Sequence, residues 1–118
     1  LDSIWDNSMG YKISGTPPLH RNGHTATLVT TPSVDGGNGK EKAFIFVIGG
    51  WSRHRRATSE VHILDISEPE KSITWLEPSE ISGETPGPCN LHSADFISGQ
   101  REIYVFRGGD GTEYHNDL

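Results

Sequence analysis

The sequence predicts an all-β fold that is built from repeated four-stranded antiparallel sheets. Two observations carry this prediction: an apolar, strand-like run ends in a glycine pair twice, and a small polar run precedes each of them. The glycine pairs are Gly49-Gly50 and Gly108-Gly109, and the polar runs contain His24 and His92. A third observation is that Gly or Pro interrupts nearly every long window, so that no segment keeps a helical period. Self-similarity with a fixed order of elements is typical of stacked modules.

The first module contains a full set of strands. They are expected at residues 23–29, 43–48, 60–66 and 73–76. The second of these strands is apolar at every position, and such a strand needs cover on both of its faces. Asp65 is expected to cap the turn after the third strand, and Trp75 is expected to be a buried aromatic side chain at the edge of the sheet.

The second module repeats only the first half of this pattern. Its apolar strand is expected at residues 103–106. The first module has about nine additional residues between its polar and apolar strands, and residues 30–42, rich in Gly, Pro, Ser and charge, supply them as an exposed loop. The sequence is therefore divided into the last strand of a preceding module with its connecting loop, a complete module, and a connecting loop with half of the next module. Their bounds are residues 1–19, 20–77 and 78–118.

The composition excludes several classes of function. The net charge is -6 at pH 7, so the chain is not expected to bind nucleic acid or an anionic membrane, since both require a basic surface. No apolar run is long enough to span a bilayer. Cys89 is the single cysteine, which excludes an internal disulfide and favours a reducing compartment, the cytoplasm or the nucleus.

The repeated pattern resembles the kelch repeat, which forms the blades of a β-propeller. The residues that carry this resemblance are Arg21, Gly23, His24, Gly49, Gly50, Asp65, Trp75, His92, Gly108 and Gly109. The second copy departs from the pattern, because Cys89 and Leu91 stand where the first copy has Arg21 and Gly23. The resemblance implies about two blades of a larger or self-assembled propeller, which in this family has roughly five to seven blades.

Self-association is one expectation that follows from the two ends of the sequence. Leu1-Asp2 at the start and Asn116-Asp117-Leu118 at the end both correspond to the third strand of a blade. One copy is therefore expected to complete the strand of its neighbour, so that three copies would close a ring of about six blades.

The resemblance implies a protein-interaction module, an adaptor or a scaffold, that presents its rim loops to a protein partner. We call residues 51–59 the basic loop and residues 110–115 the acidic loop. The candidate partner-binding residues in them are Trp51, Arg53, His54, Arg55, Arg56, Asp110, Glu113 and Tyr114. The planar guanidinium of arginine binds carboxylate or phosphate, and Trp51 can stack on a ligand. The alternative is a solvated charged loop whose arginines balance the charge of nearby glutamates.

Neither a metal nor a cofactor is predicted. The six histidines lack the spacing of zinc ligands, and no cysteine pair is present. Residues 36–40 resemble a phosphate-binding loop only faintly, because Glu41 replaces the Ser or Thr that should follow the lysine. Some kelch-like propellers are copper oxidases, but nothing assembles a copper site around Cys89. The alternative to an interaction module is part of a kelch-propeller enzyme whose catalytic residues lie on blades absent from this chain.

Overall fold

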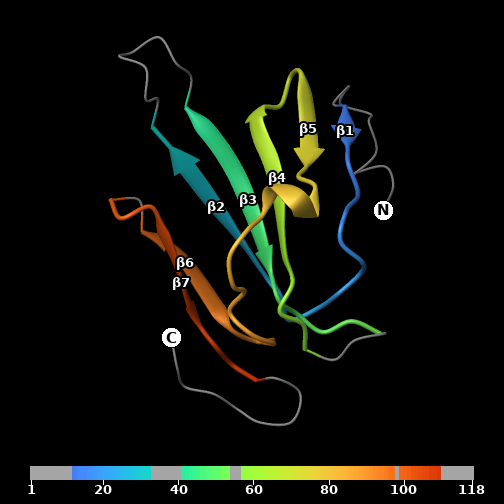
Figure 1. The fold of residues 1–118 in the computed structure, drawn as a ribbon, viewed down its shortest axis with the longest axis vertical. Coiled ribbons are helices and arrows are strands. Elements are labelled where there is room, and N and C mark those ends of the chain that lie inside the picture. Colours follow the sequence, from blue (N-terminus) through green and yellow to red (C-terminus); the bar gives the residue numbers. More distant parts are fainter. Residues whose placement is uncertain (1–11, 33–40, 54–56, 98, 110–118) are drawn as a thin grey trace.

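The computed structural model describes residues 12–32, 41–53, 57–97 and 99–109, and within these ranges the chain is all-β. One sheet has five strands and a second sheet has two (Figure 1). The strands are β1 (Ile13–Ser14), β2 (Thr25–Thr31), β3 (Lys42–Ile48), β4 (Val61–Glu68), β5 (Ser72–Trp75), β6 (Ser93–Ile97) and β7 (Glu102–Phe106). A short 3-10 turn, η2 (Pro78–Glu80), follows β5. The expectation of short strands joined by turns is confirmed.

The larger sheet has the order β1-β5-β4-β3-β2. Strands β2 to β5 form an antiparallel meander, as the sequence predicted for the first module. Strand β2 begins two residues later than expected, because Gly23 adopts a positive φ of 69° and turns the chain before the ladder starts at Thr25. Asp65 does not cap the turn after the third strand as expected, because β4 continues to Glu68. Its Oδ1 instead accepts a hydrogen bond from the Ser67 amide at 2.9 Å, within the part of β4 where the pairing with β5 is irregular.

Strand β1 was not expected, because its residues were assigned to a connecting loop. It pairs in parallel with the outer edge of β5, in the register Ile13↔Ile73. The Ile73 amide donates to the Lys12 carbonyl at 2.7 Å, and the Ser14 and Thr74 hydroxyls lie 3.1 Å apart. The segment that had been assigned to a connecting loop thus covers the otherwise open edge of β5. Trp75 on β5 is therefore half-buried inside the sheet and does not lie at its edge.

The smaller sheet corrects the expected alignment of the two modules. Thr25 pairs with Ile48 in the larger sheet, and the equivalent Ser93 pairs with Phe106 in the smaller one. Gly50 therefore corresponds to Gly108, whereas the sequence alignment of the two modules had matched Gly49 with Gly108. The two glycine pairs are displaced by one residue relative to each other. Because each pair is only two residues long, a shift of one position was not visible in the sequence. The hydrogen-bond register of the paired strands determines the correct alignment.

The two sheets meet along β2 and β6 and diverge outward from that line (Figure 1). Side chains of β2 bond across the contact. The Thr25 hydroxyl lies 3.0 Å from His92 Nε2, and the Thr27 hydroxyl donates to the Ala94 carbonyl at 3.3 Å. Since the sheets diverge from this line, few of the described side chains are fully enclosed. The buried apolar residues among those described are Val29, Val47, Ile48, Ile63 and Cys89.

Candidate functional site

A network of backbone hydrogen bonds joins the two sheets at the end where β3 and β7 finish. Isolated bridges connect Asn22 with Trp51, Trp51 with Ala57, Thr58 with Cys89, and Asn90 with Gly109. The Cys89 amide donates to the Thr58 carbonyl at 3.2 Å, and the Cys89 carbonyl accepts from Gly50 at 2.8 Å. Backbone pairing that passes from one sheet to the other resists shear between them. We call these bridged residues, together with Gly50, the platform.

Glycine is required where the backbones of the platform come closest. Gly49 has a φ of 65°, and a Cβ built on it would lie 2.6 Å from the Cys89 carbonyl oxygen and 2.9 Å from His92 Cε1. A Cβ on Gly50 would lie 2.8 Å from His24 Cβ. Both the backbone conformation and the lack of space therefore exclude a side chain. This accounts for the repeated glycines without giving them a direct role in binding.

The Arg21 side chain links the segment before β2 to the residues that follow β3 and precede β4. Its side chain is 4% exposed and donates three hydrogen bonds. Nη1 binds the Gly49 carbonyl at 3.0 Å, Nη2 binds Glu60 Oε1 at 3.0 Å, and Nε binds the Leu19 carbonyl at 3.1 Å. His62 Nε2 also lies 3.4 Å from Glu60 Oε1. Burial by itself would raise the pKa of Glu60, but the hydrogen bonds from Arg21 and His62 outweigh it and lower the pKa.

Cys89 and His92 lie where the two sheets meet. Cys89 is fully buried, and this burial raises the pKa of its thiol, with Arg107 acting in the opposite direction. Burial also lowers the pKa of His92. A thiol with a raised pKa is a poor nucleophile, so Cys89 is a small apolar packing residue here. Cys89 and Arg21 occupy equivalent positions in the two modules, and so do His92 and His24. This equivalence concerns their places in the repeat and not their roles.

The structure describes two of the candidate rim residues. Trp51 is half-buried in the platform, and Arg53 is exposed. His54, Arg55, Arg56, Asp110, Glu113 and Tyr114 lie outside the described residues. The anchors of both loops are nevertheless described: Ala57 ends the gap in the basic loop, and Gly109 directly precedes the acidic loop. Only the bridged Thr58 and the segment Cys89-Asn90 separate these anchors, so the two loops leave the same platform.

Within the described ranges, no group of three or more His, Cys, Asp and Glu side chains could hold a metal ion. No helix among the described residues is long and apolar enough to cross a membrane. The sequence did not indicate that Glu60 and His62 would join Arg21, nor that Ser52, next to the platform residue Trp51, and Thr58 would be buried polar residues. The position of Glu60 at the start of a predicted strand did not indicate its long-range partner.

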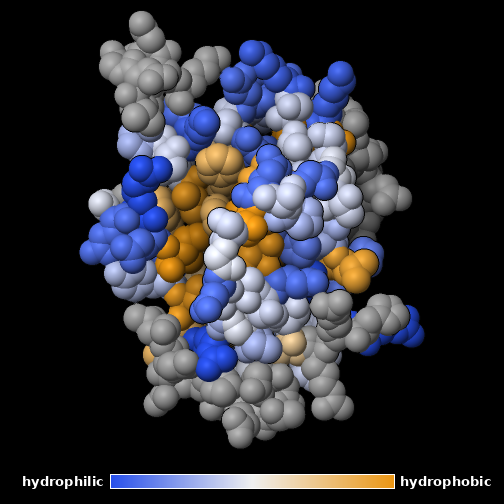
Figure 2. Space-filling model, viewed as in Figure 1, coloured by the Kyte–Doolittle hydropathy of each residue, from blue (hydrophilic) through white to orange (hydrophobic). Residues whose placement is uncertain are grey.

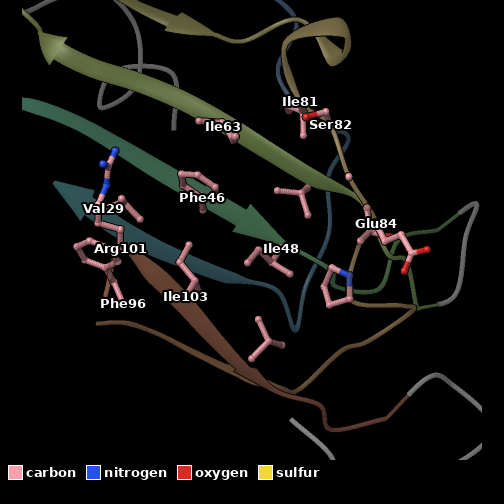
Figure 3. Close-up of a pocket in the computed structure, with 15 residues that line it drawn as sticks. Val29, Phe46, Ile48, Ile63, Ile81, Ser82, Glu84, Phe96, Arg101 and Ile103 are labelled. Atoms are coloured by element: carbon pink, nitrogen blue, oxygen red, sulfur yellow. The ribbon is translucent and has the colours of Figure 1, made fainter. Parts of the chain in front are cut away.

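An apolar cleft opens between the sheets on the side away from the β2–β6 contact. Its volume is about 550 Å³. Figure 2 shows the apolar side chains gathered in this hollow, and Figure 3 shows the two sheets pointing side chains into it. The larger sheet contributes Val29, Phe46 and Ile63, and the smaller sheet contributes Phe96, Ile103 and Val105. Residues 81–86 border the cleft at its outer side. The segment at Ile81, which repeats the segment at Ile13 in the sequence, indicated the internal repeat but not its place at this cleft.

Known proteins resemble the chain over most of its length. Acyl-CoA-binding domain-containing protein 5 of Arabidopsis thaliana is 30% identical over 107 residues, which cover 91% of this chain and 14% of that protein. Host cell factor 1 of Rattus norvegicus and of Homo sapiens is 36% identical over 104 residues, which cover 88% of this chain and 4% of those proteins. The chain thus spans a small part of the length of the curated relatives that it matches. No protein-family profile and no solved structure matches it.

Proposed function

We propose that the chain forms about two blades of a kelch-type β-propeller and serves as a protein-interaction module. In this module the basic loop and the acidic loop face a protein partner together. The single observation that carries the proposal is the platform, because its backbone hydrogen bonds join the described anchors of both loops, Ala57 and Gly109, through Thr58, Cys89 and Asn90. Loops that are held at their anchors lose less conformational entropy on binding, which favours recognition.

The arrangement of the sheets supports the propeller part of the proposal. Strands β2 to β5 form a four-stranded antiparallel meander, and the first strands of the two sheets, β2 and β6, lie side by side, as inner strands of adjacent blades do. Large apolar side chains are exposed on the outer faces, with Leu28 at 55% and Phe106 at 47%. Adjoining blades, or further copies of the chain, would cover such faces.

The similarity to host cell factor 1 supports an interaction role for a segment within a much larger protein. The chemistry of the loops defines the partner. Three arginines flank His54 in the basic loop, and they suit carboxylate groups on a partner surface. The acidic loop follows the platform residue Gly109 in the sequence, and it would repel an acidic patch of the partner and favour a basic one, so that the two loops set the orientation of the partner.

The proposal is tested by replacing Arg53, Arg55 and Arg56 together with alanine and measuring which proteins the chain recovers from cell lysate. The matched control replaces Lys12, Lys42 and Lys71 with alanine, which removes the same charge from exposed positions away from the platform. Far-ultraviolet circular dichroism of both variants verifies that the fold is kept. We expect the arginine variant to lose specific partners that the lysine variant retains. An unchanged set and amount of partners with the arginine variant would show that the basic loop is solvated surface only.

A further inference from the structure

We infer that Thr16 and Thr85 are phosphate-acceptor sites for a proline-directed protein kinase. The inference uses neither the platform nor the basic and acidic loops, so it is independent of the proposed function. Three observations carry it: each threonine is followed by proline, each side chain is exposed, and each lies in a connection whose backbone forms no hydrogen bond with the described residues. A third threonine with the same motif serves as an internal comparison.

The motif is a threonine followed by a proline. The chain contains three such pairs, at Thr16, Thr31 and Thr85, and no Ser-Pro pair. Proline lacks a backbone N–H group and restricts the preceding residue to extended conformations. A kinase groove that offers no acceptor for the next amide therefore favours proline there, because any other residue would lose a hydrogen bond to water. The motif by itself does not distinguish the three threonines, whereas their surroundings do.

Thr16 follows the point at which the chain leaves the larger sheet. Gly15 has a φ of 85°, and a Cβ built on it would clash with the carbonyl oxygen of Trp75, so the chain turns away from β5 at this glycine. The Thr16 side chain is exposed, and residues 16–18 form no backbone hydrogen bond with the described part of the chain. The acceptor hydroxyl and the backbone around it are therefore accessible to an enzyme.

Thr85 occupies the corresponding place in the connection to the smaller sheet. Gly83 precedes it with a φ of 96°, and residues 84–88 form no backbone hydrogen bond with other described residues. The Thr85 side chain is exposed, although the segment borders the apolar cleft. Thr16 is exposed even though its connection is already paired with β5. By analogy, the exposure of Thr85 does not depend on the open edge of the smaller sheet.

Thr31 has the same motif in a different setting. It is the last residue of β2, it is half-buried, and it pairs with Lys42 in the ladder with β3. Its hydroxyl can reach the ATP in a kinase only if this end of the ladder opens first. Opening costs free energy, so we expect phosphorylation of Thr31 to be slower than that of Thr16 and Thr85 by at least about tenfold.

The reaction is the transfer of the γ-phosphoryl group of ATP. The threonine Oγ1 attacks the γ-phosphorus, the bond from that phosphorus to the oxygen of the β-phosphate breaks, and ADP leaves. The hydroxyl proton passes to the catalytic aspartate of the kinase. Each phosphothreonine adds a charge of about −1.5 to −2 at pH 7. The two connections would then attract a basic surface of a partner and repel an acidic one.

The experiment incubates the full chain with ATP and a purified mitogen-activated protein kinase, and it maps the phosphorylated residues over time by mass spectrometry. We expect phosphate at Thr16 and Thr85 before it appears at Thr31. A synthetic peptide of residues 26–36, in which Thr31 has no strand partner, should be phosphorylated about as fast as the two exposed sites of the chain. This control separates the protection by the fold from any effect of the flanking sequence.

Variants test the two parts of the motif. Thr16→Ala and Thr85→Ala should each remove one site and leave the rate at the other unchanged, whereas the matched control Thr31→Ala should leave the total phosphate almost unchanged. Pro86→Ala keeps the Thr85 hydroxyl but should slow its phosphorylation by at least about tenfold, because the new residue brings a backbone N–H group. Far-ultraviolet circular dichroism verifies the fold of each variant. The triple arginine variant of the basic loop should be phosphorylated normally, so a failure of the proposed function would leave this result intact.

Three results would overturn the inference. The first is a chain that takes up no phosphate at Thr16 and Thr85 while the peptide of residues 26–36 is phosphorylated. The second is an equal rate at all three threonines of the chain, which would show that the fold does not select the site. The third is a rate at Thr85 that Pro86→Ala leaves unchanged, which would assign this threonine to another class of kinase.

Discussion

The buried guanidinium of Arg21 allows the sharpest test of how the fold is held together. Replacing Arg21 with alanine removes hydrogen bonds to the Gly49 carbonyl, the Leu19 carbonyl and the Glu60 carboxylate. Breaking a fully buried ion pair costs about 3–5 kcal/mol, because the remaining charge is left without a partner. Glu60 is 36% exposed, so water can replace part of the lost interaction. We therefore expect the free energy of unfolding to fall by about 2–4 kcal/mol.

The assay is urea unfolding followed by circular dichroism, with Arg53→Ala as the matched control. Arg53 is exposed, so the same substitution there should change the free energy of unfolding by less than about 0.5 kcal/mol. If Arg21→Ala lowered the free energy of unfolding by less than about 1 kcal/mol, the hydrogen bonds of Arg21 would not stabilise the start of β2. Our account of the buried guanidinium would then be refuted.

The pH dependence gives this prediction a second readout. The folded-state pKa of Glu60 lies below its ordinary value of 4.5, so the unfolded chain binds the proton more readily. The stabilisation is therefore complete above pH 4.5 and is lost as the pH falls through the folded-state pKa. The difference in unfolding free energy between the unchanged chain and Arg21→Ala should shrink over that window. A difference that stayed constant with pH would assign the effect of Arg21 to its packing and its carbonyl contacts alone.

Three further measurements test other parts of the structure. Gly49→Ala should lower the free energy of unfolding by about 2–4 kcal/mol through the clash with Cys89, whereas Gly99→Ala, which meets open space, should change it by under about 0.5 kcal/mol in the same urea assay. The Cys89 thiol should react with Ellman's reagent at least about 100-fold more slowly in the native chain than in urea, and comparable rates would contradict its burial. Burial lowers the pKa of His92 from 6.5, so its neutral form stabilises the fold above pH 6.5 and this contribution is lost as the pH falls below that value. His92→Gln should reduce the loss of stability between about pH 7.5 and pH 5.5, and an equal loss in both proteins would disprove the role of this side chain.

The sequence pattern predicted the antiparallel meander of β2 to β5 and the apolar strand β7, but not β1. Residues 43–48 are apolar on both faces, and a strand of that kind had to lie inside a sheet with cover on each side. The glycines at 49 and 50 marked a close backbone approach, which the structure confirms at Cys89 and His24. These features are readable because periodicity and glycine placement are local properties of the chain.

Contacts between residues far apart in the sequence became visible in the folded chain alone. The pairing of β1 with β5, the hydrogen bond of Arg21 to Glu60 and the bridge from Thr58 to Cys89 all join residues far apart in the sequence. Their partners depend on how the sheets twist and dock, which local pattern does not encode. The apolar cleft has the same origin. The individual strands predicted apolar faces, but the gap between the sheets exists because the two sheets meet along β2 and β6 and diverge from that line.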